Sequence, residues 1–267
     1  MNRLARPLLG LATAAVLAFI YIPLAVVVAY AFNSSGTTSW PPAGFSTKWL
    51  ELALANTGLR DALLTSIAIA ISAASIAVLL GSLAAFAVAR YRFFGRDAIS
   101  FVVVFPIALP GIVTGMALST TFATTGFPLG FFSIVVGHAT FCVVLVYNNV
   151  VARLRRTSRT QEEASGDLGA DTWTTARRVT LPAVRTALIA GGLLAFALSF
   201  DEIIVTNFTA GPGVQTLPLW IFANYQRPNN LPLVNVAAVL VLVLSILPVY
   251  IASRLTEDPG AVAGARG

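Results

Sequence analysis

The sequence contains very few charged side chains and few reactive ones. Of its 267 residues only 10% are charged and 57% are hydrophobic, and the mean hydropathy is +0.82. Soluble domains carry about 25% charged residues because their surfaces face water, so much of this chain must face lipid instead. A single cysteine excludes a disulfide framework and any zinc or iron–sulfur site built from cysteines.

Lysine and histidine each occur once, as Lys48 and His138. A P-loop needs the pattern G-x-x-x-x-G-K-[ST], in which the lysine contacts nucleotide phosphates. The stretch S-T-K-W around Lys48 lacks this pattern, so we expect any ATP hydrolysis to occur in another chain. His138 and Cys142 have a spacing that can share a metal, but without a second histidine or cysteine we expect them to pack rather than bind one.

Long apolar runs make up most of the chain. Six of them approach or exceed the roughly 20 residues that a helix needs to cross the hydrocarbon core. Runs this long without alternation are not strands of a barrel, so the sequence predicts a single, all-α, polytopic membrane domain with six transmembrane helices. The predicted helices cover residues 8–32, 62–89, 99–122, 129–151, 183–208 and 233–252.

The basic residues are distributed unevenly between these runs. If the N-terminus is cytoplasmic, 14 of the 17 basic residues fall in cytoplasmic segments, and only Lys48, Arg60 and Arg227 fall outside. The positive-inside rule therefore predicts that both termini are cytoplasmic. Topology thereby explains the net charge of +6, and we do not expect nucleic acid to be a partner.

The predicted cytoplasmic segment 152–182 is polar in a chain that otherwise avoids polarity. Its run T-Q-E-E, from Thr160 to Glu163, has the form of a capping box, which starts a helix. Gly169 then suits a left-handed residue at the end of that helix.

A second short helix is expected directly after this glycine. Asp171 and Thr172 are good N-cap residues, and Arg177 and Arg178 suit the C-terminal end of such a helix electrostatically. Pro182 suits the first turn of the fifth span. The order helix, glycine, helix, proline favours a docking platform over a solvated linker.

The spacing of glutamate, glycine and Leu-Pro in this segment resembles the EAA motif of binding-protein-dependent ABC importer permeases. From Glu163 to Pro182 the motif reads E-A-S-x3-G-x9-V-x-L-P, with serine in place of the third small alanine and valine in place of isoleucine. Other stretches resemble the spermidine/putrescine branch of the family. They cover residues 45–49, 65–66, 90–95, 198–202, 208–212 and 216–219. The resemblance implies the type I (MetI-like) ABC importer permease fold.

In this family the EAA loop is a coupling helix that seats in a cleft of a separate ATPase subunit. The resemblance therefore implies a set of ATPase-coupling residues and a short helix over residues 170–176 that presses on the ATPase. The coupling residues are Glu163, Ala164, Gly169, Ala170, Asp171, Leu181 and Pro182.

The resemblance also implies that this chain is a non-catalytic subunit with no cofactor of its own. ATP and Mg would be bound by two ATPase subunits, and an extracytoplasmic solute-binding protein would deliver the solute. A second permease, expected to form a heterodimer with this one, would complete the pore. The expected location is the bacterial cytoplasmic (inner) membrane, in contact with membrane lipid.

The favoured solute is small and cationic, a polyamine such as spermidine or putrescine. The branch also contains permeases for iron, thiamine, phosphonates and other small solutes such as amino-acid derivatives, which stay as alternatives. Polyamine-specific members often carry an acidic residue after the second proline of the third span, where this chain has Gly111.

Asp201 and Glu202 are the acidic residues expected on the translocation path. They lie within the predicted fifth span, 16 residues beyond Arg185, where charges are costly and usually face a cavity, a partner or a pathway. A hydrogen bond between helices or an ion pair with the second permease is the structural alternative. Successive residues point about 100° apart on a helix, so only one of the two is expected to face the path.

Three further residues are path candidates. Pro110 and Gly111 follow Pro106 in the third span, and prolines that kink a helix are as consistent with a gate or lining helix as with a static kink. Tyr225, in an outside segment, could contact solute or a delivery protein, although anchoring at the membrane interface is the simpler role.

Two other classes of protein fit the sequence less well. A secondary transporter could use Asp201 and Glu202 for proton coupling, but such carriers usually have internal repeats with matched broken helices, and no second copy of the proline-rich third span is evident. An intramembrane serine protease needs a nucleophile–base pair, but the chain has one histidine and no G-x-S-G pattern.

Overall fold

The computed structural model describes residues 5–36, 40–227 and 230–256, and these residues are built from helices and their connections. In chain order the elements are α1 (Ala5–Ala31), α2 (Lys48–Ala55), α3 (Thr57–Arg90), α4 (Arg96–Ala108), α5 (Gly111–Thr125), α6 (Phe131–Arg156), α7 (Thr160–Asp167), α8 (Thr172–Thr175), the π-helical turn η1 (Ala176–Thr180), α9 (Leu181–Phe200), α10 (Ile204–Thr209), α11 (Leu217–Tyr225) and α12 (Leu231–Thr256).

Five helical stretches of the described chain are long and apolar enough to cross a membrane. They are Pro7–Ala31, Thr57–Arg90, Phe131–Arg156, Thr172–Phe200 and Leu231–Arg254. Helices α4 and α5 pass the same test as a pair that is bent by 107°. This architecture agrees with the predicted all-α, polytopic membrane protein.

The chain forms two compact units. Of the described residues, those up to Asp61 and those within Trp220–Val243 form one unit, and those within Ala62–Leu219 and from Leu244 to Thr256 form the other. The second unit contains all the predicted site residues except Tyr225, so it is the one that matters for function.

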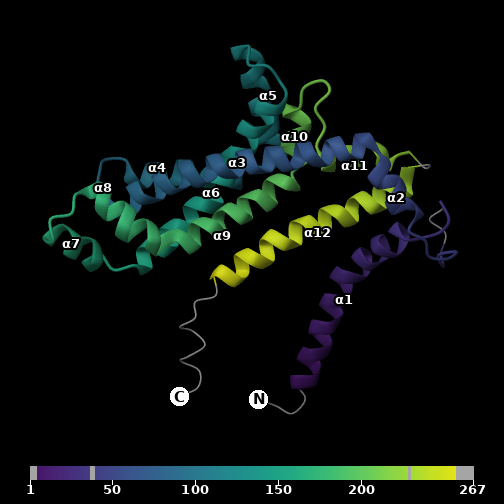
Figure 1. Ribbon diagram of the computed structural model, residues 1–267, viewed down its shortest axis with the longest axis horizontal. Coiled ribbons are helices and arrows are strands. Elements are labelled where there is room, and N and C mark those ends of the chain that lie inside the picture. Colours follow the sequence, from purple (N-terminus) through teal and green to yellow (C-terminus); the bar gives the residue numbers. More distant parts are fainter. Residues whose placement is uncertain (1–4, 37–39, 228–229, 257–267) are drawn as a thin grey trace. The chain divides into compact units, whose positions relative to one another are not determined.

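Helix α6 is the centre of the second unit, and 67% of its most apolar stretch is buried. Its buried face packs against α3 and α9 (Figure 1). Two glycines allow these helices to approach closely. A Cβ added at Gly81 of α3 would lie 2.8 Å from the carbonyl oxygen of Val143, and one at Gly191 of α9 would lie 3.1 Å from the Cα of Val146. Small residues at such interfaces are typical of membrane helices.

The third predicted span, 99–122, is not one kinked helix. It breaks after Ala108, because Leu109 (φ −79°, ψ 141°) and Pro110 (φ −56°, ψ 132°) are extended. The proline ring disfavours the helical region for the residue before it, so α4 ends here. Helix α5 then stands across α4 and packs on α10 (Figure 1).

The fifth predicted span, 183–208, is also broken. Helix α9 ends at Phe200 and α10 begins at Ile204, so the residues from Asp201 to Ile203 leave the helix. The prediction that Asp201 and Glu202 lie on one continuous helix is therefore wrong. Apolarity sets the length of a membrane segment, but it does not distinguish a continuous helix from one interrupted at polar residues.

Candidate functional site

The first helix of the predicted coupling loop is α7, but the predicted capping box at its start does not form. Helix α7 starts at Thr160 itself, so Arg159 occupies the N-cap position and makes no side-chain capping bond. Ser158 serves the helix start instead, accepting a hydrogen bond from the backbone N–H of Thr160 at 3.2 Å. Glu162 and Glu163 lie in the first turn, where negative charge interacts favourably with the helix dipole.

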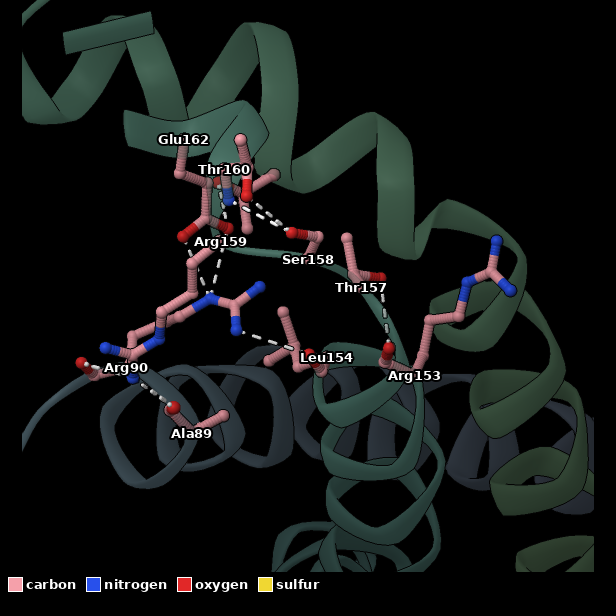
Figure 2. Close-up of polar contacts among 10 residues, drawn as sticks. Ala89, Arg90, Arg153, Leu154, Thr157, Ser158, Arg159, Thr160 and Glu162 are labelled. Atoms are coloured by element: carbon pink, nitrogen blue, oxygen red, sulfur yellow. Dashed lines mark hydrogen bonds and ion pairs between the residues drawn. The ribbon is translucent and has the colours of Figure 1, made fainter. Parts of the chain in front are cut away.

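Glu162 joins α7 to the rest of the unit, a role that the sequence did not reveal. Its carboxylate oxygens lie 2.9 and 3.1 Å from Nε of Arg90, at the end of α3, and it accepts a hydrogen bond from the Thr180 hydroxyl at 3.0 Å. Arg90 also donates to the carbonyl of Leu154 in α6 at 3.2 Å. The Arg90 and Glu162 side chains are only 12% and 19% exposed. Figure 2 shows Arg90 reaching towards both Glu162 and Leu154.

Arg159 makes a second connection to α3. Its Nη2 donates to the carbonyl oxygens of Ala89 at 3.0 Å and Arg90 at 3.1 Å (Figure 2). The last carbonyls of a helix have no partners within the helix, and arginine side chains commonly satisfy them. The loop is therefore tied to the end of α3 by a buried ion pair and by this cap.

Gly169 has the left-handed conformation that the sequence predicts, with φ +83°. Its N–H donates to the carbonyl of Gly166 at 2.8 Å, and the N–H of Ala170 donates to that of Ser165 at 3.1 Å. These bonds close the end of α7. An added Cβ at Gly169 would meet nothing within 4 Å, so backbone conformation rather than space makes glycine the suitable residue.

Asp171 is the N-cap of α8, as predicted. Its backbone is extended, and its carboxylate accepts a hydrogen bond from the N–H of Thr174 at 2.8 Å. Hydrogen bonds from Thr174 hold the pKa of the Asp171 carboxyl below its ordinary value. The side chain of Thr174 contributes most to this shift and its backbone N–H contributes less. The hydroxyls of Ser165 and Thr175 lie 3.0 Å apart and join α7 to α8.

The second short helix, predicted over residues 170–176, does not end before the fifth span. Helix α8 runs through η1 into α9 and forms one continuous helical stretch, Thr172–Phe200. Pro182 lies in the first turn of α9, as the sequence predicts, but with helix on both sides. A proline ring clashes with the carbonyl four residues earlier in a regular α-helix, and the wider π-helical turn at that point relieves the clash.

The predicted coupling residues lie on or beside an exposed surface. Glu163, Ala164, Gly169, Asp171, Leu181 and Pro182 are exposed, and Ala170 is half-buried. Two large apolar side chains lie among them. Leu168 is 88% exposed and Trp173 is 72% exposed, and neither was singled out from the sequence because only the fold shows that they are uncovered.

The second group of candidate residues surrounds the break between α9 and α10. The backbone N–H of Asp201 donates to the carbonyl of Ala197 at 3.3 Å and caps α9. The Glu202 carboxylate accepts a hydrogen bond from the N–H of Val205 at 2.9 Å, and its backbone carbonyl accepts one from the Thr206 hydroxyl at 2.9 Å. Glu202 thus closes the start of α10.

Two cavities adjoin this break. One, of about 200 Å³, is lined by Pro106, Gly111 and Glu202 among others. The other, of about 450 Å³, is lined by Asp201 and Glu202 together with apolar residues of α6, α9 and α12. Glu202 therefore borders both cavities, whereas Asp201 borders only the larger one. The path candidates Gly111 and Glu202 are brought together, although they lie far apart in the sequence.

Each cavity also has a hydroxyl that the sequence did not single out. Thr114 lines the smaller cavity and Ser245 the larger. Within the described part of the chain, the hydroxyl oxygens of both are buried and have no hydrogen-bond partner. Pro110 lies at the break before α5, outside the linings of both cavities, and Tyr225 is exposed at the end of α11 in the other unit.

Comparisons with known proteins identify relatives over almost the whole chain. Residues 77–257 match the family described as binding-protein-dependent transport system inner membrane component. The chain is 38% identical to the spermidine/putrescine transport system permease protein PotC of Escherichia coli, over 91% of this chain and 92% of PotC. It is 37% identical to the putrescine transport system permease protein PotI of Escherichia coli, over 84% and 82% of the two chains.

Solved structures show the same fold at low sequence identity. A bacterial ABC transporter involved in the import of the acidic polysaccharide alginate has a chain that matches with a TM-score of 0.73 and 17% identity, over 97% of this chain and 99% of that one. An amino acid ABC transporter matches with a TM-score of 0.58 and 17% identity, over 77% of this chain and 98% of that one.

Proposed function

The chain belongs to the family of binding-protein-dependent transport system inner membrane components, and from this membership we propose that it forms half of the path through which an ATP-driven importer takes up a polyamine such as spermidine or putrescine. The predicted family and fold class are confirmed. The chain is a non-catalytic, multi-pass inner membrane permease in a system that includes an ATPase and a periplasmic binding protein.

The observation that carries the polyamine proposal is the position of Glu202 beside both cavities. A carboxylate at that position attracts an ammonium group, and low dielectric surroundings strengthen the attraction. Gly111 lines the smaller cavity together with Glu202. Glu202 therefore supplies to this cavity the negative charge that polyamine-specific members often have at the position of Gly111. The names of the relatives PotC and PotI agree with such a solute.

The cytoplasmic loop is the proposed contact with the ATPase. Large exposed apolar side chains among polar residues are typical of a protein–protein contact, and Leu168 and Trp173 are two such side chains within the EAA segment, residues 152–182. Glu163, Ala164, Gly169, Ala170, Asp171, Leu181 and Pro182 would form the contact together with these two. Because α8 continues through η1 into α9, a push on the loop would be transmitted directly to α9, which ends at Phe200 just before Asp201.

The remaining assembly follows from the family and the charge distribution. We propose six spans, one of them formed by the bent pair α4–α5, with both termini in the cytoplasm. Two ATPase subunits would bind ATP and Mg, a second permease would complete a heterodimeric pore, and the binding protein would release solute at the outer mouth. Pro110 and Tyr225 are proposed, with Gly111, Asp201 and Glu202, to contribute to the path.

Uptake by the complete importer tests the proposal. Reconstituted with its partners, the importer should accumulate labelled putrescine in an ATP-dependent manner, and spermidine should compete whereas thiamine and phosphonates should not. Glu202→Gln should lower uptake by about tenfold or more, the effect expected when a hydrogen-bonded charge is lost. Asp201→Asn should have a smaller effect, because Asp201 borders one cavity only.

Two results would contradict the proposal. Uptake of thiamine, iron or a phosphonate in place of a polyamine would refute the proposed solute while leaving the family intact. Wild-type putrescine uptake in both variants, at wild-type expression, would remove Asp201 and Glu202 from the path.

A further inference from the structure

His138 bridges the break between α9 and α10. It lies on α6 and is fully buried. Its Nδ1 lies 2.8 Å from the hydroxyl of Ser199, in the last turn of α9, and its Nε2 lies 2.9 Å from the hydroxyl of Thr206, in α10. One side chain therefore contacts the helices on both sides of Asp201 and Glu202.

The hydrogen bonds determine which ring nitrogen carries the proton. The Thr206 hydroxyl donates its hydrogen to the backbone carbonyl of Glu202 at 2.9 Å, so it can only accept from His138. Nε2 of His138 is therefore the donor, and Nδ1 accepts a hydrogen bond from Ser199. The side chains of His138, Ser199 and Thr206 are at most 3% exposed. Water therefore cannot replace any of these hydrogen bonds if one is lost.

The hydrogen bonds from Ser199 through His138 and Thr206 lead to Glu202. Thr206 holds its backbone carbonyl, and the N–H of Val205, a residue that is 2% exposed, holds its carboxylate. The backbone and the side chain of Glu202 are thus both fixed by α10. His138 in turn fixes α10 relative to α6 and the end of α9.

We propose that His138 is a positioning residue for solute translocation, which acts through Ser199 and Thr206 to hold the Glu202 carboxylate between the two cavities. His138 itself borders neither cavity and touches no solute. The inference goes beyond the packing role expected from the sequence, and it rests on the proposed function of Glu202.

Substitutions at Thr206 and His138 test this role through the apparent affinity for solute. Thr206→Val keeps the shape of the side chain but removes both of its hydrogen bonds, and it should raise the KM for labelled putrescine by about threefold to tenfold, as expected for one or two buried hydrogen bonds. Thr206→Ser keeps the hydroxyl and should restore a KM near that of the wild type. His138→Leu should raise the KM as well, and the double variant should add little, because residues of one network are not additive.

Cys142 provides a matched control. It lies one turn beyond His138, is equally buried, and donates through Sγ to the carbonyl of Ala195 in α9 at 3.3 Å, so it takes no part in the hydrogen bonds that link His138 to Glu202. Cys142→Ala should leave the KM unchanged. Ser199→Ala provides a second test if Thr206→Val lowers the yield of folded protein.

A labelling experiment gives a second readout that requires no solute. Cys142 is the one cysteine of the sequence, so Asp201→Cys in a Cys142→Ala background gives a single thiol at the break. Adding Thr206→Val should raise the rate at which a cationic methanethiosulfonate reacts with this thiol by about threefold or more, because the break loses its fixed conformation. Thr206→Ser should not.

The outcomes separate the inference from the proposed function. An unchanged KM and an unchanged labelling rate in Thr206→Val, together with impaired uptake in Glu202→Gln, would overturn the role of His138 alone. Wild-type uptake in Glu202→Gln would overturn the proposed function of Glu202, and the inference with it. A raised KM that Thr206→Ser does not rescue would also count against positioning through the hydroxyl.

Discussion

Two adjacent glutamates of the EAA segment have different surroundings. Glu163 belongs to the EAA motif and is exposed, whereas Glu162 forms a largely buried ion pair with Arg90 and accepts from Thr180. Removing one partner of a buried pair leaves the other charge without compensation, which costs more than the pair itself contributes. We therefore expect Glu162 to stabilise the position of the loop and Glu163 to be available for contact with the ATPase.

Glu162→Ala should destabilise the permease by about 2–4 kcal/mol, because Arg90 would remain buried without its carboxylate. Glu163→Ala should change stability by less than about 0.5 kcal/mol, as is usual for an exposed side chain. Thermal unfolding of the two purified variants in the same detergent measures the difference. Equal unfolding midpoints would show that the ion pair does not hold the loop.

Asp201 and Glu202 are also adjacent acidic residues with different surroundings. A regular helix would point them about 100° apart and leave one of them away from the path. At the break, Asp201 instead caps the end of α9, and the Glu202 carboxylate accepts a hydrogen bond from the N–H of Val205 in the first turn of α10. Asp201 and Glu202 therefore differ in the cavities that they border, and not in the direction in which a regular helix would point them.

At the scale of elements, a glycine separates the two short helices of the EAA segment, α7 and α8. Gly169 has φ +83°, whereas Gly166 lies inside α7, and an added Cβ meets nothing within 4 Å at either position. The two glycines therefore differ in backbone conformation but not in available space. They form a matched pair for testing whether the turn itself couples the loop to the ATPase.

Gly169→Ala should weaken co-purification of the ATPase, because a left-handed residue other than glycine costs about 1 kcal/mol or more. Gly166→Ala should retain the ATPase and stabilise α7 by up to about 1 kcal/mol, the helix propensity difference between the two residues. Tagged permease pulled down with its ATPase measures both. Equal recovery of the ATPase by the two variants would contradict a role for the turn in coupling.

The two broken helices meet each other. Gly111 and Gly115 of α5 face Ile204 and Phe208 of α10, and a Cβ added at Gly115 would lie 2.6 Å from the Phe208 ring. Backbone that leaves the helix at membrane depth is tolerated where it is enclosed by protein or lines a cavity. The breaks at Pro110 and at Asp201 therefore lie next to one another, beside the cavities that Glu202 borders.

At the scale of the whole molecule, the charge distribution predicts the orientation. Lys48 precedes the second span on the proposed outside, and Arg156 ends α6 on the proposed cytoplasmic side. Both side chains are exposed. Moving a cluster of arginines across the membrane is unfavourable during insertion, so the orientation should be uniform.

Single cysteines in a Cys142→Ala background test this orientation. A cysteine in place of Lys48 should react with a membrane-impermeant maleimide on intact spheroplasts, whereas one in place of Arg156 should react only after permeabilisation. Both should react in detergent, which controls for accessibility. The reverse pattern would invert the topology and place the EAA loop out of reach of the ATPase.

The sequence by itself determined the class of protein and two local features of the EAA segment, the glycine turn and the Asp171 cap. Apolar run length, the distribution of arginines, and the spacing of Glu163, Gly169 and Pro182 are local or one-dimensional properties, and they predicted a helical membrane permease with a glycine turn and an Asp171 cap. The predicted capping box does not form, because it requires Thr160 as the N-cap, whereas α7 already begins at Thr160.

Only the tertiary structure decided which polar residues face one another. The pairs Arg90–Glu162 and His138–Thr206 are separated by 72 and 68 residues in sequence, so no spacing rule connects them. The break at Pro110 follows from the proline itself, whereas the position of Glu202 beside both cavities depends on the packing of several helices. Hydropathy measures how well a segment dissolves in lipid, whereas the position of a buried carboxylate depends on the hydrogen bonds that other helices provide.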